Sequence, residues 1–278
     1  MFKYLLAGIA GIFLAAGLLT TAGAANEGRV RVIHASPDAP NVDVYANGNR
    51  VLSDVPFKAS SGYLSVPAGN YVFSVYPAGA NPSTTSAVLS IDATVQSGVD
   101  YTVVALDRVS QIKGRVFVDD NSAPASGKAH INVIHAGPDA PAVDVAVTGG
   151  PVLVSGAGFG EKAGPLPVDA GTYDLEVRPA ASNQVALAVP GVRLESGKLY
   201  TFVATGFLSG QPALTVVPYV ESPVAAAPAT GSAHVAPPRA GDGGLAATES
   251  AGTSYLLYGA IALTVVGFAG AARIATRN

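Results

Sequence analysis

Hydrophobic and polar residues alternate over short stretches along most of the chain, which is the pattern of half-buried β-strands. Residues 29–34 alternate in this way, and residues 42–46 place three apolar side chains on one face. Asn47 and Gly48 follow directly and predict a type I′ hairpin turn. Further strands are expected in the first half of the chain at residues 71–75, 88–93 and 101–106.

This series predicts an all-β body. With about seven short strands per half, we expect two tandem immunoglobulin-like or transthyretin-like β-sandwich domains, at residues 28–119 and 128–220. The 32 glycines and 20 prolines fit tight turns, and no long row of helix-period residues interrupts the strands. The helix content of the body should therefore be close to zero.

An internal repeat supports the division into two domains. Residues 32–44 read VIHASPDAPNVDV and residues 133–145 read VIHAGPDAPAVDV, so eleven of thirteen positions are identical. The further matching pairs are residues 66–71 with 168–173 and residues 97–102 with 196–201. Two copies of about a hundred residues, each one structural unit, account for most of the body.

The repeated motif also carries a family resemblance. The pattern H-A-x-P-D-A-P-x-V-D-V, followed by the turn P-A-G-x-Y, resembles the bacterial DUF4397 family, a domain of unknown function. The resemblance covers roughly residues 28–220 and both copies. It implies an exported bacterial protein built from β-sandwich repeats, and it supplies no activity.

The N-terminal end has the features of an export signal. Residues 1–24 combine a positive charge at Lys3, an apolar run at residues 4–19 and small residues up to the end, which predicts a signal peptide cleaved after Ala24. Cleavage after Ala25 and an uncleaved anchor helix are the alternatives.

The C-terminal end has the features of a membrane anchor. Residues 254–273 predict a transmembrane helix, since the apolar run within them would rise about 27 Å. Arg273 and Arg277 lie at its end, so the positive-inside rule places the C-terminus in the cytoplasm and the body outside the cell. Residues 221–253 are rich in Ala, Pro, Gly, Ser and Thr and are expected to form a disordered stalk.

Within the stalk, residues 238–244, from Pro238 to Gly244, resemble a bacterial sortase sorting signal when taken with the apolar span and basic tail. In that family the enzyme cuts after a Thr that precedes Gly and joins the protein to the cell wall. Ala240 occupies that position here. Single-pass membrane anchoring is therefore the preferred expectation, and sortase-like wall attachment is the alternative.

The motif supplies the candidate site residues, which are His34, Asp38 and Asp43 in the first copy and His135, Asp139 and Asp144 in the second. Imidazole and carboxylate groups serve as metal ligands and as acid–base catalysts, and pairing of the flanking strands would bring His34 toward Asp43. The preferred interpretation is structural. Asp38 would cap backbone N–H groups of the turn, His34 would donate to a backbone carbonyl, and Asp43 would be solvated or bonded to a nearby loop.

Metal binding has little support from the pattern. A His and an Asp are too few ligands for a zinc site, so we expect no metal and no cofactor at the corners. Asp119, Asp120 and Asn121, between the domains, carry the oxygen ligands that calcium prefers. No full oxygen cage is visible there, and a solvated linker is the preferred interpretation.

Composition excludes several classes of protein. The chain has no cysteine, which excludes disulfides, thiolate metal sites and a cysteine nucleophile. The net charge is −3 and the basic residues are scattered, so no nucleic acid partner is expected. The Gly-rich residues 156–160 precede no helix pattern and are expected to form a hairpin loop. No G-x-S-x-G elbow is present, and no Trp could line a sugar-stacking cleft.

Together these features predict a non-catalytic surface or envelope protein that displays tandem β-sandwiches for adhesive, structural or partner contacts. The partner would be a surface protein or an envelope polymer. The first alternative is a module that binds a small ligand or ion through the His/Asp corners, which requires His34 and His135 to be accessible. The second alternative is an envelope hydrolase.

Overall fold

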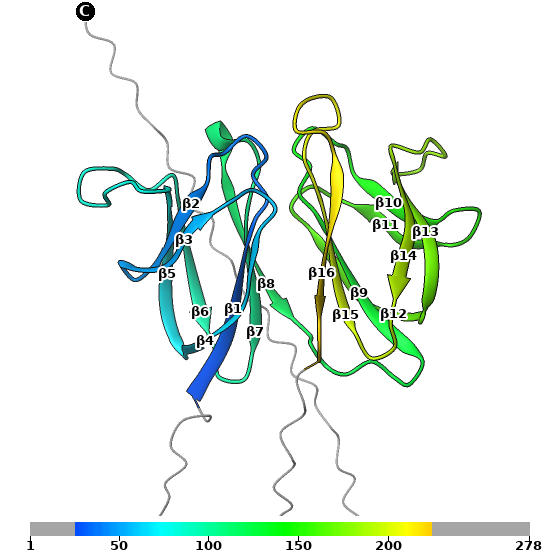
Figure 1. Ribbon diagram of the computed structural model, residues 1–278, viewed down its shortest axis with the longest axis horizontal. Helices are drawn as coiled ribbons and strands as arrows, with labels where there is room; N and C mark the ends of the chain where they lie inside the picture. Colours follow the sequence, from blue (N-terminus) through cyan, green and yellow to red (C-terminus); the bar gives the residue numbers. More distant parts are fainter. Residues whose placement is uncertain (1–25, 224–278) are drawn as a thin grey trace, which may run out of the picture. The chain divides into compact units, whose positions relative to one another are not determined.

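The computed structural model describes residues 26–223, and these residues form two β-sandwiches of eight strands each (Figure 1). The strands of the first sandwich are β1 (Glu27–His34), β2 (Val42–Ala46), β3 (Asn49–Val55), β4 (Ser60–Pro67), β5 (Gly69–Pro77), β6 (Leu89–Val95), β7 (Asp100–Leu106) and β8 (Lys113–Asp119). The strands of the second are β9 (Lys128–His135), β10 (Val143–Val147), β11 (Val152–Ala157), β12 (Lys162–Asp169), β13 (Gly171–Pro179), β14 (Leu187–Leu194), β15 (Leu199–Thr205) and β16 (Thr215–Glu221). One short 3-10 turn, η2 (Val109–Gln111), follows β7. The all-β prediction is confirmed.

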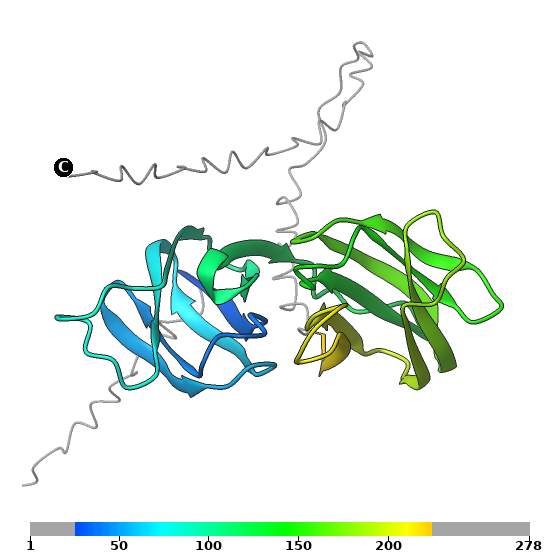
Figure 2. The ribbon, with the colours of Figure 1, turned by 90° about the horizontal axis from the view of Figure 1, so that it is seen from above.

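Each sandwich consists of two four-stranded sheets that face each other, as the two views in Figures 1 and 2 show. In the first sandwich the sheet orders are β4-β1-β7-β8 and β3-β2-β5-β6, and the second sandwich repeats them as β12-β9-β15-β16 and β11-β10-β13-β14. The first strand pairs in parallel with the seventh in both copies, and the other pairs are antiparallel. An immunoglobulin constant domain instead has the sheets ABED and CFG. The sheet order of an immunoglobulin constant domain therefore does not describe these sandwiches.

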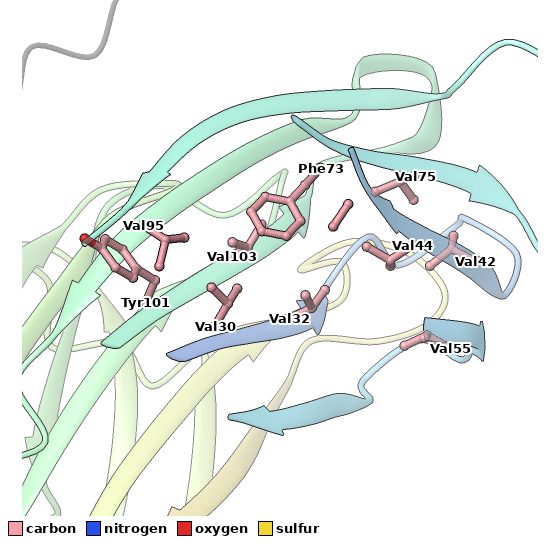
Figure 3. Packing of buried hydrophobic residues seen from close by; sticks show 11 residues of the cluster. Val30, Val32, Val42, Val44, Val55, Phe73, Val75, Val95, Tyr101 and Val103 are labelled. Carbon is pink, nitrogen blue, oxygen red and sulfur yellow. The ribbon is translucent and has the colours of Figure 1, made fainter. Parts of the chain in front are cut away.

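The hydrophobic core of the first sandwich lies between its two sheets (Figure 3). Val30 and Val32 of β1 and Val103 of β7 face Val44 and Phe73 of the other sheet, and all five are almost fully buried. Burying side chains of this size stabilises the sandwich by about 1.5–3 kcal/mol each. The apolar residues of the alternating pattern therefore form the inward face of each strand.

The hairpin between β2 and β3 forms as predicted. Asn47 has φ 49° and Gly48 has φ 81°, and a type I′ turn requires positive φ at both positions. Register pairing of Ala46 with Asn49 closes the hairpin.

The sequence pattern predicts about seven strands per domain. It marks no range for β4 or β8, and for β3 it gives only the hairpin turn that precedes the strand. These three strands lie at sheet edges, where one side of the strand has no neighbour. They therefore bury few side chains, and β3 has only one buried residue, Val55. The expected hairpin at residues 156–160 is also wrong, because β11 and β12 belong to different sheets and the loop crosses from one to the other.

Several expectations concern residues outside those that the structure describes. They are the signal peptide at residues 1–24, most of the stalk, the segment 238–244 and the transmembrane helix at residues 254–273. Within residues 26–223, no helix has the length and apolar character needed to cross a bilayer.

Candidate functional site

The first His/Asp corner begins where β1 ends. The ring of His34 is 1% exposed, and its Nε2 donates a hydrogen bond to the carbonyl oxygen of Pro40 at 3.1 Å. Its Nδ1 accepts a hydrogen bond from the backbone N–H of Ser36 at 3.4 Å, which assigns the proton to Nε2. The edge of the ring meets Phe57, with centroids 6.2 Å apart. The His34 side chain thus holds both sides of the Pro-Asp-Ala-Pro turn.

The two carboxylates of this corner also bind backbone groups. Asp38 accepts a hydrogen bond from the N–H of Val109 at 2.7 Å, which ties the turn to the loop after β7. Asp43 is 2% exposed and accepts from the N–H groups of Asp54 at 2.8 Å and Gly79 at 3.2 Å. These N–H donors are the main reason that the pKa of Asp43 is lowered.

The second copy repeats the arrangement. His135 is fully buried, its Nε2 donates to the carbonyl of Pro141 at 2.9 Å, and its Nδ1 accepts from the N–H of Gly137 at 3.3 Å. Asp139 accepts from two successive N–H groups in the loop after β15. Asp144 accepts from the N–H of Gly156 at 2.7 Å and from that of Ala181 at 3.3 Å.

Burial has a clear electrostatic effect on both histidines. The pKa of His34 and the pKa of His135 are lowered, chiefly because desolvation disfavours the charged imidazolium. Both rings are therefore neutral at physiological pH and inaccessible to solvent. This observation gives no support to a ligand-binding role for the corners, which needed exposed rings.

The structure does not bring His34 and Asp43 together as a reactive pair, since each binds its own backbone partners. No group of three or more metal-ligating side chains forms anywhere in the part of the chain that the structure describes. The hydrogen bonds of these residues are those of a corner held together by its own side chains.

The segment Asp119 to Asn121 differs from the solvated linker that the sequence suggested. The Asp119 side chain is 4% exposed and forms an ion pair with Lys162 of the second sandwich at 2.7 Å. Its other oxygen accepts from the hydroxyls of Tyr63 and Thr102. Both carboxylate oxygens are thus committed to protein donors. Only Asp120 of the three residues is exposed, and it accepts from the N–H of Ser122.

Asp119 belongs to an interface between the two sandwiches that sequence analysis missed. Arg31 projects from the outer face of β1, is 1% exposed, and pairs with Glu221 of β16 at 2.6 Å. Its guanidinium also donates to Thr102 and Thr201, one from each sandwich, and lies 4.8 Å from the ring centroid of Tyr63. Both sandwiches fall within one compact unit of the chain.

An apolar cluster surrounds these polar contacts. Ile33 and Val104 of the first sandwich pack with Ile134 and Val203 of the second, and all four are fully buried. Strands β7 and β15 each bury all seven of their residues, so both faces of these central strands are covered. We call this contact the module interface, with Arg31, Glu221 and this apolar cluster at its centre.

Two consecutive apolar runs in the sequence could have revealed the module interface. Residues 103–106 and 202–204 are apolar at consecutive positions, which is the pattern of a strand covered on both faces. Arg31, however, occupies a polar position of an alternating strand and is indistinguishable from a solvated residue in sequence.

Comparison with known proteins identifies one matching family. The family model described as "Domain of unknown function (DUF4397)" matches residues 28–146 and 129–237. No curated protein matches the chain.

Two solved structures show weak similarity. The Bacillus anthracis TIE protein has 10% identity and a TM-score of 0.20 over 65% of this chain, which spans about a third (34%) of that chain. CBMbc (family CBM26) from Eubacterium rectale Amy13K, solved in complex with maltoheptaose, has 9% identity and a TM-score of 0.21 over 71% of this chain and 98% of that one. Neither TM-score is high enough to support an argument about fold or ligand.

Proposed function

The chain belongs to the DUF4397 family, and we propose that its two sandwiches act as one non-catalytic unit that makes partner contacts at the cell surface. The surface location rests on the export signal and membrane anchor expected from residues 1–24 and 254–273. The absence of catalysis is inferred from the way in which the motif residues are used.

The observation that carries the proposal is the burial of His34 and His135, at 1% and 0% exposure. A general base must reach a substrate proton directly or through one water molecule. Both imidazoles instead have each ring nitrogen engaged by the backbone of their own turn. The most specific motif of the chain is thus used to hold each sandwich together.

The module interface favours one rigid unit over two domains that move independently. A sheet face that packs against another sheet excludes water from both, and the buried Arg31 has its charged partner on the other sandwich. Such a unit would carry contact surfaces at fixed separation. This geometry suits adhesive or structural contacts better than a flexible tether does.

Surface labelling and an activity assay together test the proposal. Intact cells that express the full-length chain would be treated with a membrane-impermeant biotin ester, which reacts with exposed lysines. We expect labelling without lysis and no release of soluble fragments from purified cell envelopes by the isolated protein. Two results would refute the proposal. One is labelling that occurs only after lysis, and the other is release of soluble envelope fragments at a rate proportional to the protein concentration.

A further inference from the structure

The module interface leaves only two sheet faces free in the described body. The outer faces of β4-β1-β7-β8 and β12-β9-β15-β16 pack against each other, which is why β7 and β15 are buried throughout. The remaining faces are the outer faces of β3-β2-β5-β6 and β11-β10-β13-β14. Any broad, flat contact made through a sheet must therefore use one of these two.

The free face of the first sandwich carries a pair of aromatic rings. Tyr45 of β2 and Tyr76 of β5 are both partly exposed, with ring centroids 5.1 Å apart and an angle of 72° between the rings. Their strand neighbours Val44 and Val75 are buried in the core, so the tyrosines point outward. An edge-to-face pair of this kind is stabilised by about 0.5–1.5 kcal/mol beyond its area burial, which keeps both rings in place.

Hydrogen-bonding side chains flank the rings. Arg50 of β3 and Ser74 of β5 lie in register on either side of Tyr45, and Ser90 of β6 lies next to Ser74 with the two hydroxyls 3.3 Å apart. We call Tyr45, Tyr76, Arg50, Ser74 and Ser90 the tyrosine platform.

The hydroxyl groups of the platform tyrosines are not used by the fold. In the described part of the chain, every other tyrosine uses its hydroxyl in a hydrogen bond with a neighbouring strand, turn or sandwich. These residues are Tyr63, Tyr71, Tyr101, Tyr173, Tyr200 and Tyr219. Within residues 26–223, no such bond involves Tyr45 or Tyr76. Both hydroxyls are therefore available to a ligand.

The second sandwich lacks the platform although it shares the fold. The register places Ala146 where Tyr45 lies, Glu176 where Ser74 lies and Arg178 where Tyr76 lies. Arg178 donates to Glu176, so an ion pair on this face replaces the aromatic pair. The sandwich folds with either set, which means that the rings of the first copy are not required by its architecture.

We propose that the tyrosine platform binds a neutral polysaccharide chain, an inference that rests on the proposed surface role. The faces of pyranose rings present C–H groups that pack on aromatic rings, and their edges present hydroxyls that pair with serine, tyrosine and arginine side chains. Protein partners gain most of their binding energy from anchors that are desolvated in well-packed pockets. The platform is open, and short hydroxyl side chains and Val72 border its rings.

The charge of the platform selects for a neutral polymer. Arg50 is the platform's one cation, and its guanidinium lies 3.5 Å from the Asp43 carboxylate, which offsets it. Asp92 of β6 adds a negative charge on the same face, next to Val72. A phosphorylated or sulfated polymer would meet no unpaired cation there.

Affinity electrophoresis of the full-length chain in neutral detergent tests the inference. Native gels would contain amylopectin, laminarin or galactomannan, and the retardation of each variant would be measured against polymer concentration. We expect at least one polymer to retard the wild-type chain. Tyr45→Ala and Tyr76→Ala should each weaken binding at least tenfold, and Tyr45→Phe should retain most of it.

The matched control is Arg178→Ala, on the equivalent face of the second sandwich, which should bind as the wild type does. Thermal unfolding of each variant shows whether the fold is intact. The inference is overturned if none of the three polymers retards the chain. It is equally overturned if a folded Tyr45→Ala chain binds the polymer like the wild type. The same holds if the tyrosine variants still bind the polymer and have lost only the ability to bind a surface protein.

These outcomes are separable from the proposed function. A chain that is labelled on intact cells but binds no polysaccharide refutes the platform alone. A chain that is inaccessible on intact cells, or that releases reducing sugar from a bound polymer, refutes the proposed non-catalytic surface role whatever the gels show.

Discussion

His34 shows how one side chain can determine the shape of a corner. The ring connects the end of β1 to Pro40 and to Ser36, and it does so from a site with almost no solvent exposure. A buried donor or acceptor without a partner costs about 1–3 kcal/mol, so each of these bonds matters mainly because its loss leaves a polar backbone group unpaired. His135 does the same in the second sandwich.

Replacing His34 with Ala should destabilise the first sandwich by about 2–4 kcal/mol. The change leaves the Pro40 carbonyl without its donor and opens a cavity beside Phe57. Thermal or urea unfolding of the full-length chain measures the effect, with Gln96→Ala on an exposed site as the control. An unchanged unfolding midpoint would show that the ring does not hold the corner.

The two corner histidines should also make stability depend on pH. Their folded-state pKa lies below the ordinary value of 6.5, so the unfolded chain binds protons more readily. Stability is therefore complete above about pH 6.5 and is lost as the pH falls from there toward the folded-state pKa. Urea unfolding at pH 7 and pH 5 should give the lower stability at pH 5.

The double variant His34→Gln, His135→Gln isolates this contribution, because glutamine keeps a donor and does not titrate. Asp43 and Asp139 have lowered pKa values and act at lower pH, below 3.8. Burial raises the pKa of Glu221, so this residue makes the folded state more stable as the pH falls toward 4.5, opposite to the effect of the histidines. The difference between wild type and double variant removes both, and a difference of zero would contradict the assignment.

At the scale of strands and turns, the sequence predicted those elements whose inner face is wholly apolar. Val42, Val44 and Ala46 alternate because one side of β2 faces the core, and Asn47-Gly48 is a turn that sequence identifies directly. Edge strands β3, β4 and β8 carry a weaker pattern, since a strand with a single neighbour buries less of its length. Single-strand patterns also leave strand order undetermined, because pairing depends on residues far apart in the chain.

The candidate site divides in the same way. The hydrogen bond from His34 to Pro40 lies within the turn and follows from local geometry. Asp38 was expected to cap N–H groups of its own turn, but it accepts instead from the N–H of Val109, far away in the sequence. The ion-pair partners of Asp119 and Arg31 lie on the other sandwich, at Lys162 and Glu221. Those contacts arise only when two whole sheets pack, and for that reason no local pattern predicted them.

A glycine at the corner after β15 offers a test at this scale. Gly206 has φ +96°, and a Cβ added there would lie 2.4 Å from the carbonyl oxygen of Ala213. Gly206→Ala should destabilise the second sandwich by more than about 2 kcal/mol, from both strain and overlap. Gly197→Ala is the matched control, because Gly197 has φ +78° and open space around it. Equal losses of stability for the two variants would show that the backbone overlap is absent.

Across the whole described body, the module interface joins two structurally equivalent sandwiches through unlike residues. Arg31 on the first sandwich has Glu221 as its partner, while the equivalent position on the second carries Asn132. Burying an isolated charge costs several kcal/mol, and therefore Arg31 favours the state in which the second sandwich supplies its carboxylate. The interface therefore couples the two copies through a charge pair that only the tandem arrangement supplies.

A double-mutant cycle on Arg31 and Glu221 measures this coupling. Glu221→Gln should cost about 3 kcal/mol or more, since it leaves a buried guanidinium without its charged partner. Arg31→Met alone and with Glu221→Gln completes the cycle, and the double variant should be less destabilised than the sum of the single ones. Additive losses in unfolding free energy would show that the two residues do not interact.

If the two sandwiches form one rigid unit through the module interface, the distance between them should be fixed, and a distance distribution measures this. The chain has no cysteine, so Ser90→Cys and Ala188→Cys would place one spin label at equivalent register positions on the free face of each sandwich. Pulsed electron spin resonance on the full-length chain should give one narrow distance distribution, and Arg31→Ala should broaden it. A broad distribution in the otherwise unchanged chain would contradict the rigid unit and the surface role built on it.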